Sequence, residues 1–265
     1  MTMVKSYVVD AFTNEIFRGN PAAVLFVDDF PSDEMMQNIA MENKLSETAF
    51  AIEKDDNHYD LRWFTPAGEI DLCGHATLAT GFLVFQKATP KNGQTVVFHT
   101  MSGDLTVTKK GNLYEMDFPA YDLKEVPVTD AMVKAYGVQP EAAYLGRDLL
   151  CVFPEGTAIA EMAPDMEELK KLDGTLQHAT ATGDGQYDCI SRSFAPKLGI
   201  AEDPVCGSGH CHIAPYWSKR LGKQQITAYQ ASPRTGVLYC DSEGGRTKLS
   251  GEAVLYSENE VNLAI

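Results

Sequence analysis

The sequence is short of positive charge. Its 265 residues include 22 Lys and Arg against 37 Asp and Glu, and the formal net charge is −15. A surface of this sign repels nucleic-acid phosphates and anionic lipid headgroups, and no cluster of basic residues counters it. We therefore expect no nucleic-acid partner and no membrane partner. A small anionic substrate is also repelled at long range, so its site has to be built locally from backbone N–H groups and a few side chains.

Long apolar runs are missing too. Every such run is well short of the roughly 18 to 20 residues that cross a bilayer. The N-terminus lacks the basic start, the apolar stretch and the cleavage site of a secretory signal, and Tyr7-Val8-Val9 is typical of a strand. Low-complexity segments are absent, and 44% of the residues are hydrophobic, as in folded globular proteins. These features predict a folded cytoplasmic protein.

The sequence also lacks the motifs of nucleotide and metal sites. There is no G-x-G-x-x-G after a strand and no G-x-x-x-x-G-K-[ST], and Gly207-Ser208-Gly209 is only a fragment. A metal site could be imagined in Cys206, His210, Cys211 and His212. Structural zinc draws on two separated ligand pairs, however, and the adjacent Cys211 and His212 are poorly spaced to reach one ion. We expect no metal and no organic cofactor.

Cysteines are few and scattered. A chain of this size needs no disulfide staples, so we expect free thiols at all six positions: Cys73, Cys151, Cys189, Cys206, Cys211 and Cys240. For Cys151, Cys189 and Cys240 the common use of a lone cysteine, filling the core, is the expected one.

One pattern occurs twice. Arg62-Trp63-Phe64-Thr65-Pro66 leads to Cys73-Gly74-His75, and Arg192-Ser193-Phe194-Ala195-Pro196 leads to Cys206-Gly207-Ser208, about half the chain further on. Two unrelated strand-loop-helix junctions could share these residues by accident. The agreement in order, spacing and position favours duplication of one α+β unit.

Each copy is typical of a strand that ends near the Phe-x-Pro, a loop, and a helix opened by Cys-Gly. We expect these helices over residues 76–86 and roughly 213–221, with Pro215 in the first turn of the second helix. The predicted fold is α+β with two halves, residues 1–118 and residues 119–265.

Two further helices are expected, over residues 32–43 after an N-cap Ser32 and over residues 165–172. Short strands, broken by Gly, Asp and Asn turns, fill most of the remaining sequence.

The two Cys-Gly helix starts are candidate anion sites. A helix N-terminus presents unpaired N–H groups and the positive end of its dipole. If a pseudo-twofold relates the halves, Cys73-Gly74-His75 and Cys206-Gly207-Ser208-Gly209 face each other across a cleft. The alternative is a pair of ordinary packed turns. Groups able to move protons accompany these segments: Cys73, Cys206, His75, Asp203 and Glu47.

Four segments together resemble the phenazine-biosynthesis (PhzF-like) family. In chain order they are Gly19-Asn20-Pro21-Ala22-Ala23-Val24, Ser46-Glu47-Thr48, Cys73-Gly74-His75-Ala76-Thr77 and Glu202-Asp203-Pro204-Val205-Cys206-Gly207-Ser208-Gly209. The combination of the first three in this order is specific, whereas any one of them alone is weak.

The resemblance implies a diaminopimelate-epimerase-like fold, with two pseudo-symmetric halves that each wrap a mixed β-sheet around a central helix. It also implies a homodimer that needs no metal or organic cofactor. By matching the motifs, Glu47, His75 and Asp203 would be the catalytic residues, with Glu47 as acid/base. The substrate's carboxylate would be bound at Cys73, Gly74, Cys206, Gly207, Ser208 and Gly209.

One departure from the family pattern keeps a second hypothesis open. This chain has a Cys in both motifs, Cys73 and Cys206, as do the related proline racemases and diaminopimelate epimerases, which use two thiols. Against this, the first motif reads Cys-Gly-His and not Cys-Gly-Asn, and Ser46-Glu47-Thr48 has no purpose in a two-thiol mechanism. We therefore predict a biosynthetic-type isomerase that moves a proton through Glu47. The non-enzyme alternative is a protein that only binds a small carboxylic acid.

Overall fold

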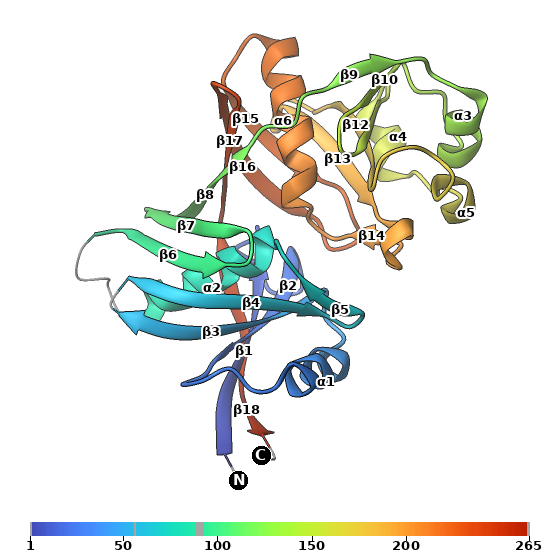
Figure 1. The fold of residues 1–265 in the computed structure, drawn as a ribbon. Helices are drawn as coiled ribbons and strands as arrows, with labels where there is room; N and C mark the ends of the chain where they lie inside the picture. The colour runs from blue at the N-terminus through green and yellow to red at the C-terminus, as the bar shows by residue number, and fades with distance from the viewer. Residues whose placement is uncertain (1, 56, 88–92, 264–265) are drawn as a thin grey trace. The chain divides into compact units, whose positions relative to one another are not determined.

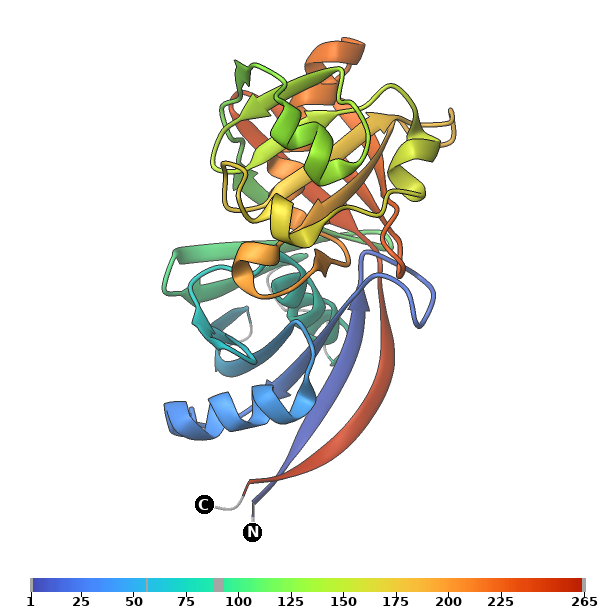
Figure 2. The ribbon, with the colours of Figure 1, turned by 90° about the vertical axis from the view of Figure 1, so that its right-hand side faces the viewer.

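The two ends of the chain belong to one structural unit. In the computed structural model, which describes residues 2–55, 57–87 and 93–263, β1 (Thr2–Ala11) pairs antiparallel with β18 (Ala253–Leu263), as Figure 1 and Figure 2 show. The first unit comprises Met1–Asp117 and Ser250–Ile265, and the second unit comprises Phe118–Leu249. The predicted halves divide the sequence at nearly the same place. They differ at the C-terminus, because hydrogen bonds to β1 hold the last strand in the first unit.

The first unit is a mixed sheet. From β1 the pairing runs antiparallel to β2, parallel to β3 and antiparallel to β4. β4 then pairs antiparallel with the short β5 and parallel with β6, and β6 pairs antiparallel with β7. The strands are β2 (Asn20–Phe26), β3 (Glu47–Asp55), β4 (His58–Thr65), β5 (Gly68–Ile70), β6 (Thr95–Thr100), β7 (Gly103–Lys110) and β8 (Leu113–Pro119).

The second unit repeats this pairing pattern strand for strand. β10 is antiparallel to β11, β11 parallel to β12, and β12 antiparallel to β13. β13 pairs antiparallel with β14 and parallel with β15, and β15 pairs antiparallel with β16. The strands are β9 (Lys124–Val126), β10 (Ala142–Leu145), β11 (Leu149–Val152), β12 (Gln177–Thr182), β13 (Cys189–Phe194), β14 (Glu202–Asp203), β15 (Gln225–Gln230), β16 (Gly236–Glu243) and β17 (Arg246–Gly251).

The arginine of the repeated sequence pattern forms the same kind of ion pair in both units. Arg62 of β4 binds both carboxylate oxygens of Glu69 at 2.7 Å, and Arg192 of β13 binds both oxygens of Glu202 at 2.8 and 2.7 Å. Two-point pairs of this kind fix the geometry of both partners. Each therefore holds the strand before the helix against the short strand that follows it. The structure thus confirms the duplication predicted from the two motifs.

A buried helix follows the repeated motif in each unit. α2 (Gly74–Lys87) is buried from His75 to Phe85 and packs against β1, β2, β3, β7 and β18. A helix surrounded in this way is expected to be largely apolar on all sides, and the buried Thr77 and Thr80 of α2 donate to carbonyls one turn earlier, of Cys73 and Ala76. α6 (Gly207–Leu221) packs against β15 and β16, and its Trp217 donates from Nε1 to Thr180 Oγ1 of β12 at 2.9 Å.

The expected start of the second central helix was wrong. α6 begins at Gly207, with Cys206 as its N-cap, so Pro215 lies inside the helix and not in its first turn. Proline has no N–H for the carbonyl one turn earlier and normally breaks a helix there. Here the N–H of Tyr121 bonds to that carbonyl, on Cys211, at 3.0 Å. The N–H of Tyr121, which is distant in sequence, therefore donates the hydrogen bond to Cys211 that Pro215 cannot.

The smaller helices agree in part with expectation. α1 (Asp33–Asn43) has the predicted N-cap Ser32, whose side chain accepts from the N–H of Met35. α5 (Met166–Leu169), capped by Asp165, is shorter than predicted, because the chain continues in tighter i→i+3 turns as far as Leu172. α3 (Asp130–Tyr136) and α4 (Gly156–Ala160) were not predicted.

All six cysteines are buried free thiols, as expected. In the part of the chain that the structure describes, no helix combines the length and the apolarity needed to cross a bilayer.

We expect Gly81→Ala to destabilise the first unit. A Cβ at Gly81 of α2 would lie 2.7 Å from Cγ1 and 2.9 Å from Cβ of Val107 on β7. Overpacking of this kind costs about 1–3 kcal/mol, more than the gain of up to ~1 kcal/mol from replacing a helical glycine. Urea unfolding of Gly81→Ala, Val107→Ala and the double variant measures the loss in the free energy of unfolding. The double variant should lose less stability than the two single losses added together; strict additivity would contradict the steric explanation.

Candidate functional site

Three of the predicted site residues meet in the first unit. Glu47 is the first residue of β3 and lies opposite Ala22 of β2 in the strand register. Its Oε2 is 2.9 Å from Nε2 of His75, in the first turn of α2, and Nδ1 of His75 is 3.6 Å from Sγ of Cys73. The side chains of His75 and Glu47 are only 8% and 15% exposed. The segments Ser46-Glu47-Thr48 and Cys73-Gly74-His75 therefore form one buried cluster, which sequence spacing alone could not have shown.

The side chains of Cys73, His75 and Glu47 influence one another electrostatically. Burial by itself lowers the pKa of His75, but the contacts with Cys73 and Glu47 outweigh it and raise that pKa well above the usual value. Burial, together with the negative charge of Glu47, raises the pKa of the Cys73 thiol. The contacts with His75 act in the opposite direction and lower the pKa of Cys73. Cys73 and Glu47 thus both favour a protonated imidazole at His75. A carboxylate in close contact with an imidazole is a suitable group for accepting and returning a proton.

The predicted residues of the second unit gather at the start of α6. The Sγ of Cys206 accepts from the N–H of Gly209 at 3.3 Å and lies 3.5 Å from Oγ of Ser208. Asp203 of β14 accepts from the N–H of Val205 at 3.1 Å. Burial, with the charge of Asp203, raises the pKa of Cys206 well above its usual value. This segment therefore presents a protonated thiol and hydroxyl beside the N–H groups of the first helical turn.

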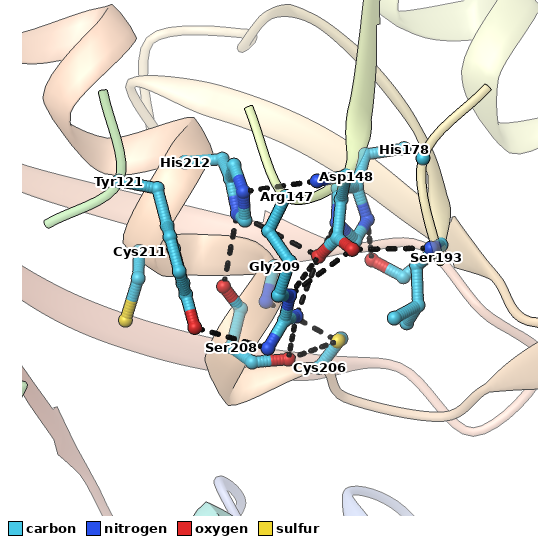
Figure 3. A network of polar contacts seen from close by, with 12 residues as sticks. Tyr121, Arg147, Asp148, His178, Ser193, Cys206, Ser208, Gly209, Cys211 and His212 are labelled. Atoms are coloured by element: carbon cyan, nitrogen blue, oxygen red, sulfur yellow. Dashed lines mark hydrogen bonds and ion pairs between the residues drawn. The ribbon is translucent and has the colours of Figure 1, made fainter. Parts of the chain in front are cut away.

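Sequence reasoning missed a cation beside this helix start. Arg147 lies in the turn between β10 and β11 and donates from Nη2 to Ser208 Oγ and from Nη1 to Tyr121 Oη, both at 3.0 Å. Its Nε and Nη2 also bind the two carboxylate oxygens of Asp148, at 3.1 and 2.5 Å. Figure 3 shows this guanidinium at the centre of a network of polar contacts. No motif marks it, because Gly146-Arg147-Asp148 has the composition of an ordinary hairpin turn.

Asp148 connects Arg147 to a fully buried group of side chains. Asp148, His178 and His212 are all 0% exposed at their side chains. Nε2 of His178 lies 3.3 Å from Asp148 Oδ2, and Nδ1 of His178 lies 3.0 Å from Ser193 Oγ. Burial by itself raises the pKa of Asp148, but hydrogen bonds from His178 and Arg147 outweigh it and hold that pKa well below the usual range. Asp148 is therefore ionised.

Two buried histidines of α6 are neutral. Burial lowers the pKa of His212 to about 4, and the interaction with His178 lowers it in the same direction. Burial also lowers the pKa of His210 to about 4. The contacts agree with this. Nδ1 of His212 donates to the carbonyl of Ser208, and its Nε2 accepts from the N–H of Asp148.

Possible metal ligands cluster in two places among the described residues, and neither is the set considered from the sequence. The clusters are Glu47, Cys73 and His75 in the first unit, and Asp148, His178 and His212 in the second. His212 therefore lies with Asp148 and not with Cys206 and Cys211. In the second cluster the guanidinium of Arg147 already balances the carboxylate, so a metal cation would have to displace it.

Comparison with known proteins identifies the family. The sequence model described as phenazine biosynthesis-like protein matches residues 9–259. An uncharacterized isomerase of Pseudomonas aeruginosa is 42% identical over 97% of this chain and 98% of its own. The chain belongs to the phenazine biosynthesis-like family.

Solved structures support the same assignment. A PhzF-family protein of Enterococcus faecalis has a TM-score of 0.95 at 45% identity, covering 99% of this chain and 100% of its own. A hydroxyproline epimerase of Agrobacterium vitis, at 8% identity, shares the fold with a TM-score of 0.66 over 98% of this chain and 91% of its own. The expected epimerase-like α+β fold of the family is thus confirmed.

We expect acid to destabilise the second unit through His210 and His212. Their pKa values are about 4 when folded and 6.5 in the reference state, so below pH 6.5 the unfolded chain binds protons that the folded chain does not. The free energy of unfolding then falls by up to about 1.4 kcal/mol per pH unit for each histidine. Urea unfolding between pH 7 and 4 measures this slope for the wild type and the variants His210→Asn and His212→Asn. Each variant should have a shallower slope; equal slopes would contradict the assignment.

Proposed function

We propose that this protein is an isomerase that moves a proton between two carbons of a small carboxylate-bearing substrate, with Glu47 as the acid/base. Family membership and the isomerase names of relatives support the reaction type. The observation that carries the role of Glu47 is its 2.9 Å contact with His75 in a buried cluster at the start of α2.

The comparison of the two units also supports this role. Phe64 and Phe194 are equivalent in the repeat and lie opposite Thr48 and Gln177 in their sheets. Glu47 precedes Thr48, and Leu176 precedes Gln177, so Leu176 stands at the position equivalent to Glu47. By the same alignment, His75 of Cys73-Gly74-His75 corresponds to Ser208. At these equivalent positions the carboxylate–imidazole pair therefore occurs in the first copy and not in the second, as expected of a group kept for chemistry and not for the fold.

The proton transfer balances without a redox partner. The Glu47 carboxylate takes a proton from one carbon, and the electron pair of the broken C–H bond passes into the conjugated system of the substrate. The carboxylic acid formed on Glu47 then returns the proton to another carbon. His75 positions the carboxylate oxygen throughout. In this proposal Asp203 orients the substrate, and the N–H groups and hydroxyl of Gly207 and Ser208 stabilise its carboxylate.

The two-cysteine racemase is the less favoured reaction. Such a mechanism needs one thiolate, whereas burial raises the pKa of both Cys73 and Cys206, an effect that His75 opposes at Cys73 and that Ser208 and the N–H of Gly209 oppose at Cys206. The proposal also retains as predictions a reaction that needs no metal or organic cofactor, a homodimer and a cytoplasmic location.

Deuterium exchange from solvent tests the proposal. A panel of amino acids and unsaturated cyclic acids is incubated with enzyme in D₂O and followed by mass spectrometry. Glu47→Gln should lower exchange by about 10²- to 10⁴-fold, the usual contribution of a general base, whereas Cys206→Ser should retain it. Glu53→Gln is the matched control, since Glu53 lies on the same strand and is exposed.

Three outcomes would contradict the proposal. Exchange at an amino acid's α-carbon that Cys206→Ser alone abolishes would indicate the two-thiol reaction. Binding without exchange by the wild type would indicate a carboxylate-binding protein. An unchanged rate in Glu47→Gln would remove Glu47 from the mechanism.

A further inference from the structure

We propose that Arg147 is a substrate-binding residue that recognises the carboxylate of the ligand. This inference rests on the proposed function, because it concerns how the same substrate is bound. It assigns a cationic contact to a site for which the sequence suggested only N–H groups and hydroxyls.

The first support is the direction of the Arg147–Asp148 ion pair. The Asp148 side chain is 0% exposed, whereas that of Arg147 is 34% exposed. The negative end of the pair is therefore buried and the positive end reaches the surface. In a chain with a net charge of −15, this supplies local attraction for an anion.

The second support is the rigidity of the guanidinium. Asp148 binds it at two points and is itself held by the N–H of Leu176, at 3.1 Å, and by His178. The ring of Tyr121 lies 4.8 Å from Cζ of Arg147 and stacks on His212 at 4.3 Å. Burying a charged carboxylate carries a desolvation cost that close partners have to offset. An arginine held on this many sides loses little further freedom when it binds a ligand.

The third support is the set of hydrogens that remain available. Of the five guanidinium N–H groups, the Asp148, Ser208 and Tyr121 contacts use four, which leaves one on Nη1. The hydroxyls of Ser208 and Tyr121 accept from Arg147, so their own hydrogens can point to another acceptor. Figure 3 shows Arg147, Ser208 and Tyr121 meeting at this point. Three donors beside a positive charge match a carboxylate.

Gly209 shows how closely this network is packed against the helix. A Cβ at Gly209 would lie 2.7 Å from Cε1 of His178 and 3.2 Å from Sγ of Cys206. The first turn of α6 thus lies directly against the histidine that holds Asp148. Ser208 and Arg147 are consequently positioned by one continuous set of contacts.

Side-chain NMR tests the proposal independently of turnover. The Nε–H signal of Arg147 in ¹⁵N-labelled protein is assigned by its loss in Arg147→Lys. The probes are acetate, benzoate and L-proline, with benzamide as the neutral match for benzoate. We expect at least one of the carboxylates to shift the signal and benzamide to leave it unchanged.

Affinities for the carboxylate that binds are then compared among variants by calorimetry. Arg147→Gln should weaken binding about 10- to 100-fold, the range for a lost hydrogen bond to a charged group. Arg147→Lys should lie between, because an ammonium cannot hold Asp148, Ser208 and a ligand with the same planar fork. Arg18→Gln removes the same charge from an exposed arginine of the first unit and should bind as the wild type does.

Failure of this inference is distinguishable from failure of the proposed function. Glu47→Gln should lose exchange yet retain the carboxylate-induced shift of Arg147. A shift in the wild type with no exchange on any substrate would overturn the proposed function but leave carboxylate recognition in place. No shift with any of the carboxylates, or unchanged affinity in folded Arg147→Gln and Arg147→Lys, would overturn the role of Arg147.

Discussion

The structure depends on burying the first turn of a helix inside a sheet. α2 and α6 both begin next to a Cys-Gly pair, and in both the residues that follow are enclosed by strands. A helix start carries unpaired N–H groups, and these need polar partners when water is excluded. The fold therefore places polar and titratable side chains at these helix starts, where the backbone requires them. The two-point pairs of Arg62 and Arg192 hold the preceding strands in position for this arrangement.

The two copies use this common frame differently. In the first unit, Glu47 at the start of β3 contacts His75. In the second, Leu176 takes the place of the acid, Ser208 takes that of the imidazole, and a short turn between β10 and β11 places Arg147 at the hydroxyl. One copy thus has groups suited to proton transfer, and the other has groups suited to binding an anion. The strand pairing is thus the same in the two units, and the side chains at the two helix starts differ.

The pKa values of the two thiols at the helix starts depend on their surroundings. Cys73 and Cys206 stand at equivalent positions, at helix starts where the dipole favours a thiolate. Full burial and the nearby carboxylates of Glu47 and Asp203 have the opposite effect and raise both pKa values. The likeness to the hydroxyproline epimerase extends to the fold.

The sequence by itself determined the fold class, the duplication, the central helices and the segments that form the first-unit cluster. It could do so because helix periodicity, capping and a repeated motif are local, and because three short motifs occur in a specific order. Only the tertiary structure decided that α6 starts before Pro215, since the N–H of Tyr121 satisfies the carbonyl of Cys211. Arg147, Asp148 and His178 likewise left no signal in the sequence, because they come from separate strands and turns. The buried carboxylate of Asp148 requires partners that offset its desolvation. Strand pairing, and not spacing along the chain, decides which side chains lie close enough to be those partners.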